Sequence, residues 1–77
     1  MISKKDKEIL KVFGNNLKKV RESKGFTLRS LSYACDVDYS DIGKIEKGLK
    51  NITLKTIVDL ARGLEVHPKK LLDFEFE

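Results

Sequence analysis

The sequence predicts a small all-α domain of five helices. Apolar residues recur at helical spacing through most of the chain, and residues that cap helices stand before several of these stretches. Only the last five residues, DFEFE, alternate as a strand would, and so short an edge strand has no evident pairing partner. A chain of 77 residues has room for one small core, and five glycines and one proline leave little for a disordered linker.

The first predicted helix begins near Ser3 and ends at Gly25. Ser3 followed by Asp6 resembles a capping box. One apolar face is formed by Ile9, Phe13, Leu17 and Val20. The triplet at 14–16, Gly-Asn-Asn, is a weak point in this helix, so residues 1–12 are either an N-terminal extension or its first part.

The middle of the chain predicts two short crossed helices, over 28–35 and 39–47, joined by a tight turn. Thr27 can cap the first helix, and Asp38, with Asp41 three residues later, can cap the second. The inner contacts of the pair are expected from Leu31, Val37, Ile42 and Ile45. The outward side of the second helix is polar.

Two further helices complete the predicted domain. Gly48 ends the third helix, and Thr53 caps the fourth, in which Gly63 is expected to loosen or end the helix. The apolar stripe of the fourth helix consists of Leu54, Ile57, Val58, Ala61 and Leu64. Pro68 suits the first position of a fifth helix, and residues 73–77 form a short acidic and aromatic tail that packs on the body or on a partner.

Charge alone says little about partners. Sixteen Lys and Arg against twelve Asp and Glu give a net charge of +4, and three of the acids stand in the last five residues, so the body is more basic than the average. No apolar run approaches the roughly 20 residues that span a bilayer, and the N-terminus lacks the pattern of a signal peptide. A cytoplasmic location is therefore expected.

Enzymatic and metal chemistry find no support in the sequence. The single Cys35 cannot form an intrachain disulfide and is expected to be a small buried residue. His67 has no Cys or second His to complete a metal site. No phosphate-binding glycine loop or nucleophilic triad appears. We therefore expect no catalytic activity, no cofactor and no metal.

The stretch from Phe13 to about Leu72 resembles the Cro and lambda-repressor type of helix-turn-helix DNA-binding domain. The matching positions are Leu17, Arg21, Lys24-Gly25, Thr27, Leu31, Val37, Ile42, Ile45-Glu46, Gly48, Leu54, Leu60-Ala61, Leu64 and the segment from Val66 to Leu72. The short form, with NITLKTIVDLARGLEV directly after the third helix, looks most like the controller proteins of restriction-modification systems. The resemblance implies a compact five-helix, lambda-repressor-like fold over residues 13–72, with the helix-turn-helix formed by helices two and three.

The resemblance also implies roles for single residues. Arg21 and Glu46 would form a structural ion pair between helices one and three. Asp36 stands at a turn position that tends to need positive φ, which aspartate tolerates. Base reading would come from Tyr39, Ser40 and Lys44. Asp41 is a further candidate, whose carboxylate could accept from cytosine but would repel phosphate.

Contacts to backbone phosphates are expected beside the third helix and at the start of the second. The candidates are Lys47, Lys50 and Asn51 in the following loop, and the backbone near Thr27 and Leu28. Lys18, Lys19 and Arg29 are weaker candidates for phosphate contacts, because an ordinary role as charged surface residues is at least as good an explanation for them.

The C-terminal part holds more apolar residues than a small monomer buries easily. These residues could complete the core or form a two-fold interface. We expect a split, with the leucines partly in the core and with Val66, Leu72, Phe74 and Phe76 partly at the interface. A homodimer with recognition helices about 34 Å apart predicts a roughly palindromic operator on double-stranded DNA. No small-molecule effector is evident. The alternative is a protein-interaction module, such as an antitoxin or co-regulator, which the acidic start of the third helix favours.

Overall fold

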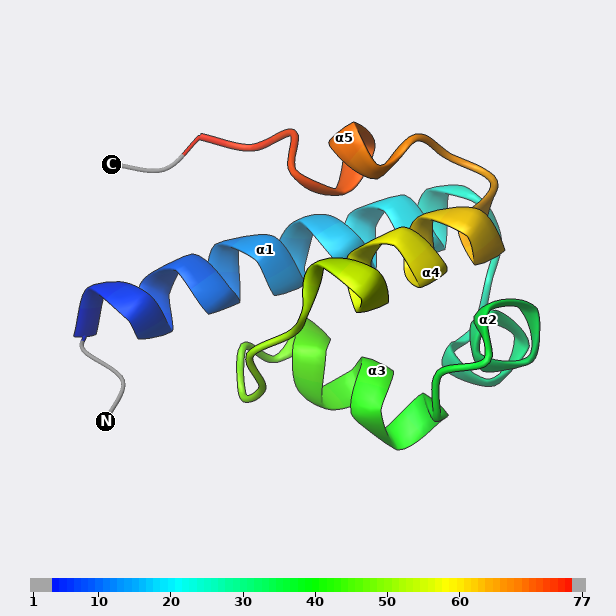
Figure 1. Cartoon of the computed structure of the whole chain (residues 1–77), viewed down its shortest axis with the longest axis horizontal. Coiled ribbons are helices and arrows are strands. Elements are labelled where there is room, and N and C mark those ends of the chain that lie inside the picture. The colour runs from blue at the N-terminus through cyan, green and yellow to red at the C-terminus, as the bar shows by residue number, and fades with distance from the viewer. Residues whose placement is uncertain (1–3, 76–77) are drawn as a thin grey trace.

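The computed structural model describes residues 4–75, which form five helices and no strand (Figure 1). The helices are α1 (Lys4–Ser23), α2 (Leu28–Cys35), α3 (Tyr39–Glu46), α4 (Leu54–Leu64) and α5 (Pro68–Leu71). The predicted all-α architecture is confirmed. None of the helices in this range is both long enough and apolar enough to cross a membrane.

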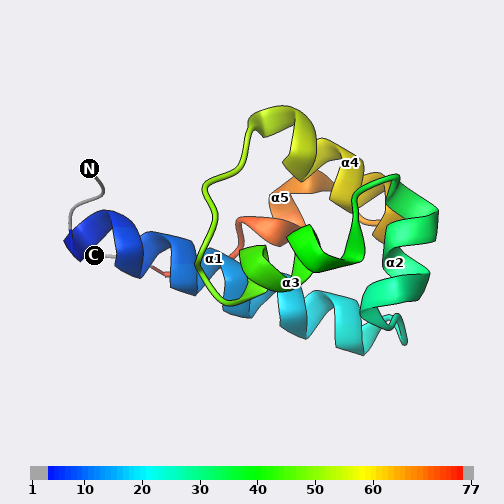
Figure 2. The ribbon, with the colours of Figure 1, turned by 90° about the horizontal axis from the view of Figure 1, so that it is seen from below.

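The helices lie in three tiers. In Figure 1, α2 and α3 lie below α1 and α4, whereas α5 and the C-terminal stretch lie above them. Figure 2, seen from below, shows α3 beside α1 with α4 and α5 behind. No other helix covers the outer side of α3 in this view, so that side is free to meet a partner.

The core lies between the helices: α2 packs on α3 and α4, α1 packs on α3 and α5, and α5 also packs on α4. Its fully buried large side chains are Leu17, Leu31, Ile42, Leu60, Leu64 and Leu71. Val37, predicted as an inner contact, is half-buried and packs against this core. The fully buried side chains all come from helices, and helical periodicity identified most of them, whereas Val37 lies in the turn between α2 and α3.

Helix α1 continues through residues 14–16, so the expected weak point does not break it, and residues 4–12 are its first part. The glycine and the second asparagine in this stretch make contacts with other helices. A Cβ on Gly14 would lie 2.5 Å from the carbonyl oxygen of Glu46, so the missing side chain lets α1 lie directly on α3. Asn16 donates 2.9 Å hydrogen bonds to the carbonyls of Lys70 and Leu71, which ties α5 to α1. Ser3, the expected cap, lies outside the described residues.

A second glycine marks the contact between α2 and α4. Gly63 was expected to loosen or end α4, but the helix continues to Leu64. A Cβ on Gly63 would lie 2.6 Å from the Cβ of Cys35, so the glycine allows close approach of the two helices. Cys35 is buried, 7% exposed, as expected for a small residue in this place.

Local signals at the helix ends are mostly confirmed. Thr27 and Thr53 cap α2 and α4 by accepting from the backbone N–H three residues on. Asp36 ends α2 with φ of 62°, the left-handed conformation expected there. Pro68 is the first residue of α5. The tail packs in part on its own body, because the ring of Phe74 meets Phe13 edge-on at 6.4 Å between centroids.

Candidate nucleic-acid interface

Helix α3 presents a polar face that no other element covers. Tyr39, Ser40 and Lys44 are exposed, whereas Ile42 and Ile45 turn into the core. Residues four apart share one side of a helix, so Ser40 and Lys44 lie on the same face, and the exposed Lys47 follows one turn later. Two of the predicted base-reading residues, Ser40 and Lys44, therefore lie on one exposed face of α3.

The start of α3 differs from the expected capping box. Asp38 occupies the N-cap position, but its side chain makes no capping hydrogen bond. Its carboxylate accepts a 2.7 Å hydrogen bond from the hydroxyl of Ser40 instead. A hydroxyl bound to a carboxylate is a strong, charge-assisted partner, so it competes well with the helix N–H groups. In the free protein the Ser40 proton is thus engaged, and its lone pairs remain open.

Asp41 and Lys50 were predicted to contact a base and a phosphate respectively, but they contact each other. The Lys50 ammonium lies 3.0 Å from the Asp41 carboxylate, and the two side chains are 45% and 37% exposed. The loop after α3 folds back to bring them together. Their separation of nine residues matches no local rule, so sequence reasoning had no signal for this pair.

A cation–π contact joins the two helices of the helix-turn-helix. The guanidinium carbon of Arg29, in α2, lies 4.4 Å from the centroid of the Tyr39 ring, at the start of α3. Both side chains are exposed. The contact holds an arginine beside the predicted base-reading residues, although the sequence offered no reason to prefer Arg29 over other surface cations.

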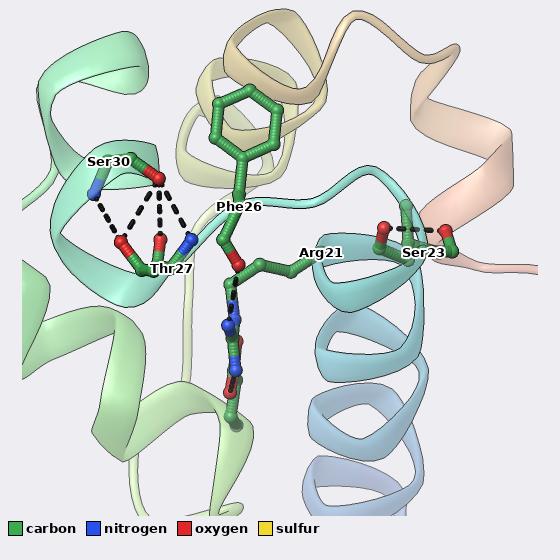
Figure 3. A network of polar contacts seen from close by, with 7 residues as sticks. Arg21, Ser23, Phe26, Thr27 and Ser30 are labelled. Atoms are coloured by element: carbon green, nitrogen blue, oxygen red, sulfur yellow. Dashed lines mark hydrogen bonds and ion pairs between the residues drawn. The ribbon is translucent and has the colours of Figure 1, made fainter.

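The start of α2 leaves two backbone donors open. Thr27 and Ser30 exchange hydrogen bonds of 3.0 and 2.8 Å between side chain and backbone, which closes the capping box (Figure 3). Helix geometry gives the N–H groups of Leu28 and Arg29 no intrahelical acceptor. Thr27 therefore acts as a cap, and the following N–H groups are the donors that a phosphate could use.

Arg21 and Glu46 form the two-point ion pair that the resemblance implies. The guanidinium donates at 2.6 and 3.0 Å to the two carboxylate oxygens, and it also donates at 2.9 Å to the carbonyl of Phe26 (Figure 3). The side chains are only 10% and 7% exposed. The hydrogen bond to Glu46 raises the pKa of Arg21, although burial opposes it. This pair fixes α1 and the connection to α2 against α3, behind its polar face.

The remaining predicted phosphate contacts lie in the loop after α3. Lys47, Lys50 and Asn51 are all exposed. Asn51 accepts a 3.0 Å hydrogen bond from the N–H of Ile52 through its amide oxygen, so its amide nitrogen remains a donor. These residues follow directly on the polar face of α3.

A groove opens where α4 leads into α5. It is lined by Val66, His67, Lys69, Lys70, Leu72 and Asp73. Leu72 is 49% exposed and Val66 is half-buried. The ring of Phe74 packs edge-on against Phe13, and Phe76 lies outside the described residues. Among the predicted interface residues that the structure describes, Val66 and Leu72 line this groove, and the half-buried Phe74 does not.

The described part of the chain contains no group of three side chains that could hold a metal ion. His67 is exposed at the N-cap of α5 and makes no capping hydrogen bond through its side chain.

Comparison with known proteins identifies this arrangement. A helix-turn-helix family model, HTH_3, matches residues 17–71, which is most of the chain. The chain belongs to this helix-turn-helix family. The match spans the polar face of α3, the Arg21–Glu46 pair and the part of the α5 groove up to Leu71.

Restriction-modification controller proteins are among the similar family members. The chain is 36% identical over 64 residues to the control protein C.BamHI of Bacillus amyloliquefaciens, covering 82% of this chain and 79% of that protein. The crystal structure of the controller C.AhdI from Aeromonas hydrophila superposes with a TM-score of 0.81 at 33% identity, covering 83% and 97% of the two chains. The crystal structure of the controller C.Esp1396I superposes with a TM-score of 0.77 at 31% identity, covering 84% of this chain and 86% of that chain.

These matches confirm the prediction of a DNA-binding transcriptional regulator of the helix-turn-helix class. They also agree with the closer resemblance to controller proteins that the segment after α3 indicated.

Proposed function

We propose that this helix-turn-helix protein acts as a homodimer on a roughly palindromic operator and controls a restriction-modification operon. The observation that carries the proposal is the uncovered polar face of α3, with Ser40 and Lys44 one turn apart. A helix entering the major groove needs such a face, because the donors and acceptors that distinguish base pairs are displayed there. Binding would need no cofactor or catalytic step, and it would take place in the cytoplasm, where the operator lies.

Roles on this face follow from its chemistry. Lys44 can donate to guanine O6 and N7, and Ser40 can accept through its free lone pairs while Asp38 holds its proton. Tyr39 offers a ring to a thymine methyl. Asp41 would read a cytosine only after leaving Lys50.

Backbone phosphates would meet the flanks of α3. Lys47, Lys50 and Asn51 supply side-chain donors, and the start of α2 supplies the N–H groups of Leu28 and Arg29. Such contacts set the register of a protein on DNA without reading its sequence.

The groove at α5 supports a dimer. Half of the Leu72 side chain is exposed next to the partly buried Val66, in a protein of small core. Helix α5, which contributes to the groove, lies on the opposite side of α1 and α4 from α3 (Figure 1), so a partner seated in the groove would leave both recognition helices free. Two-fold symmetry of the protein would then be mirrored in the operator.

The alternative function, a protein-interaction module such as an antitoxin, is favoured by the acidic start of α3. In the free protein, Lys50 compensates the charge of Asp41, whereas Asp38 keeps its charge and accepts a hydrogen bond from Ser40. Both carboxylates thus already have partners within this chain.

The proposal is tested by selecting duplexes from a randomised pool with the purified protein and sequencing the bound fraction. A two-fold symmetric motif is expected. The double variant Ser40→Ala, Lys44→Ala should keep its fold and lose the motif, whereas Lys55→Ala on α4 should select the motif unchanged. A folded wild-type protein that enriches no motif would overturn the proposal in favour of a protein partner.

A further inference from the structure

A basic groove lies between α1 and α3, on the side of the recognition helix away from Lys50. It is lined by Lys11, Asn15, Lys18, Leu28, Gly43 and Lys47, with the Arg21–Glu46 pair also at its wall. We propose that this groove is a DNA backbone-phosphate site in which α1, through Lys11 and Lys18, takes part in binding together with Lys47. The inference rests on the proposed function and extends it to a helix outside the helix-turn-helix.

The first support is the placement of side chains on α1. Lys11, Asn15 and Lys18 follow one another at spacings of four and three, which puts them on one side of the helix, facing α3. Lys19, the next residue, borders a different hollow, formed with Val12 and the C-terminal stretch. Neighbouring lysines of one helix therefore serve different surfaces.

The second support is the charge balance in the groove. Lys11, Lys18 and Lys47 are exposed, and none of them forms an ion pair with any residue in the range 4–75. The one acidic side chain at the wall, Glu46, is bound at two points by Arg21, so its charge is compensated. Three lysines in one groove then produce a positive potential that attracts an anion.

The third support is position relative to the recognition face. Gly43 and Lys47 belong to the edge of α3 that borders the groove, and Lys47 lies one turn beyond Lys44. Leu28, which lines the same groove, begins α2 and carries one of its open N–H groups. A phosphate strand beside α3 would thus pass over this groove, with Lys50 on the opposite flank.

The fourth support is that part of Lys11 is already held in place. A Cβ on Gly48 would lie 2.6 Å from Lys11 Cγ, so the lysine stem packs against the turn that ends α3. Less conformational freedom is left to lose when the ammonium binds.

The test compares Lys18→Ala with Lys19→Ala, the matched control on the same helix. Binding to the selected duplex is measured by fluorescence anisotropy over a series of salt concentrations. Each phosphate contact that is lost should reduce the slope of log K against log salt by about 0.9. We expect that reduction for Lys18→Ala, about twice as much for the double variant Lys11→Ala, Lys18→Ala, and none for Lys19→Ala. The selected motif should stay the same in all three variants.

A second measurement identifies DNA as the source of the phosphate. Duplexes carrying one neutral methylphosphonate are bound by the wild type and by Lys18→Ala. At one backbone position, the methylphosphonate should weaken DNA binding by the wild type and should not weaken binding by the variant any further. If the wild type selects a motif but Lys18→Ala keeps the wild-type salt slope and the wild-type response to every methylphosphonate, the groove inference is overturned and the proposed function stands. If the wild type selects no motif, the proposed function and the groove inference are both overturned.

Discussion

Asp41 and Lys50 hold each other in an ion pair of 3.0 Å on the edge of the recognition helix. The pair joins the residue that would repel DNA most strongly to a residue expected to bind its phosphate. Exposed pairs of this kind contribute only about 0–1 kcal/mol, so DNA can compete for the lysine. In the proposed DNA complex, the contact would limit affinity in two ways: Asp41 occupies Lys50, and its carboxylate would remain near the phosphates when Lys50 leaves.

The variant Asp41→Asn should bind duplex DNA several-fold more tightly than the wild type. Removing the carboxylate frees Lys50 and removes a repulsive charge, so the salt slope should steepen by about 0.9, the value of one phosphate contact. Anisotropy titrations at several salt concentrations measure both quantities. Asp59→Asn is the control, since Asp59 pairs with Lys55 on α4, away from α3. Weaker binding confined to sites with one particular cytosine would show instead that Asp41 reads that base.

Two glycines provide a paired test of helix packing. A Cβ at position 14 meets backbone carbonyls of α3, which cannot move aside, whereas a Cβ at position 43 would lie 3.7 Å from Leu28 Cδ1, an ordinary contact. Gly14→Ala should lower the free energy of unfolding by about 3 kcal/mol, as overpacking does. Gly43→Ala should be neutral or raise it by up to about 1 kcal/mol through helix propensity. Urea unfolding followed by circular dichroism measures the free energy of unfolding of both variants. Equal stability of the two variants would contradict the proposed close contact of α1 and α3.

Leu72→Glu should convert the proposed dimer to monomers. A carboxylate in an apolar interface loses its water without gaining a partner, which disfavours association. Sedimentation velocity at several protein concentrations reports the change. Leu54→Glu is the control, because Leu54 is also exposed, 72%, but lies at the start of α4 outside the α5 groove. A Leu72→Glu protein that still sediments as a dimer would show that the interface lies elsewhere.

The stability of the protein should fall in alkaline solution partly through Cys35. Burial raises the pKa of the Cys35 thiol above its ordinary value of 9.0. The folded state thus keeps the proton more tightly than the unfolded state, so this contribution is complete below the unfolded pKa and is lost as pH rises through the folded pKa. Above about pH 9, the wild type should lose stability faster than Cys35→Ala, by at most about 1.4 kcal/mol per pH unit. Urea titrations of both proteins across this range test it; a constant difference between them would show that the thiol is not protected.

The sequence by itself determined where the helices lie and how most of them end. Periodic apolar residues locate α1 to α4, and Thr27 and Thr53 act within a few residues of their own positions. The left-handed conformation of Asp36 was expected only through the family resemblance. Such signals depend on hydrogen bonds and side-chain contacts between near neighbours, which the order of residues specifies directly. The Arg21–Glu46 pair, 25 residues apart, was reached only through the family resemblance.

Tertiary structure alone decided the contacts between distant segments. Residue order suggested a weak point at Gly14, but the glycine serves the approach of α1 to α3. It also suggested a cap for Asp38, whose carboxylate bonds Ser40 instead. The Asp41–Lys50 pair and the lysine groove beside α1 depend on how the loop after α3 and the rotation of α1 set side chains in space. A charged surface residue has no fixed partner in the sequence, because any of several distant charges can meet it, and only the packing of the helices selects which one does.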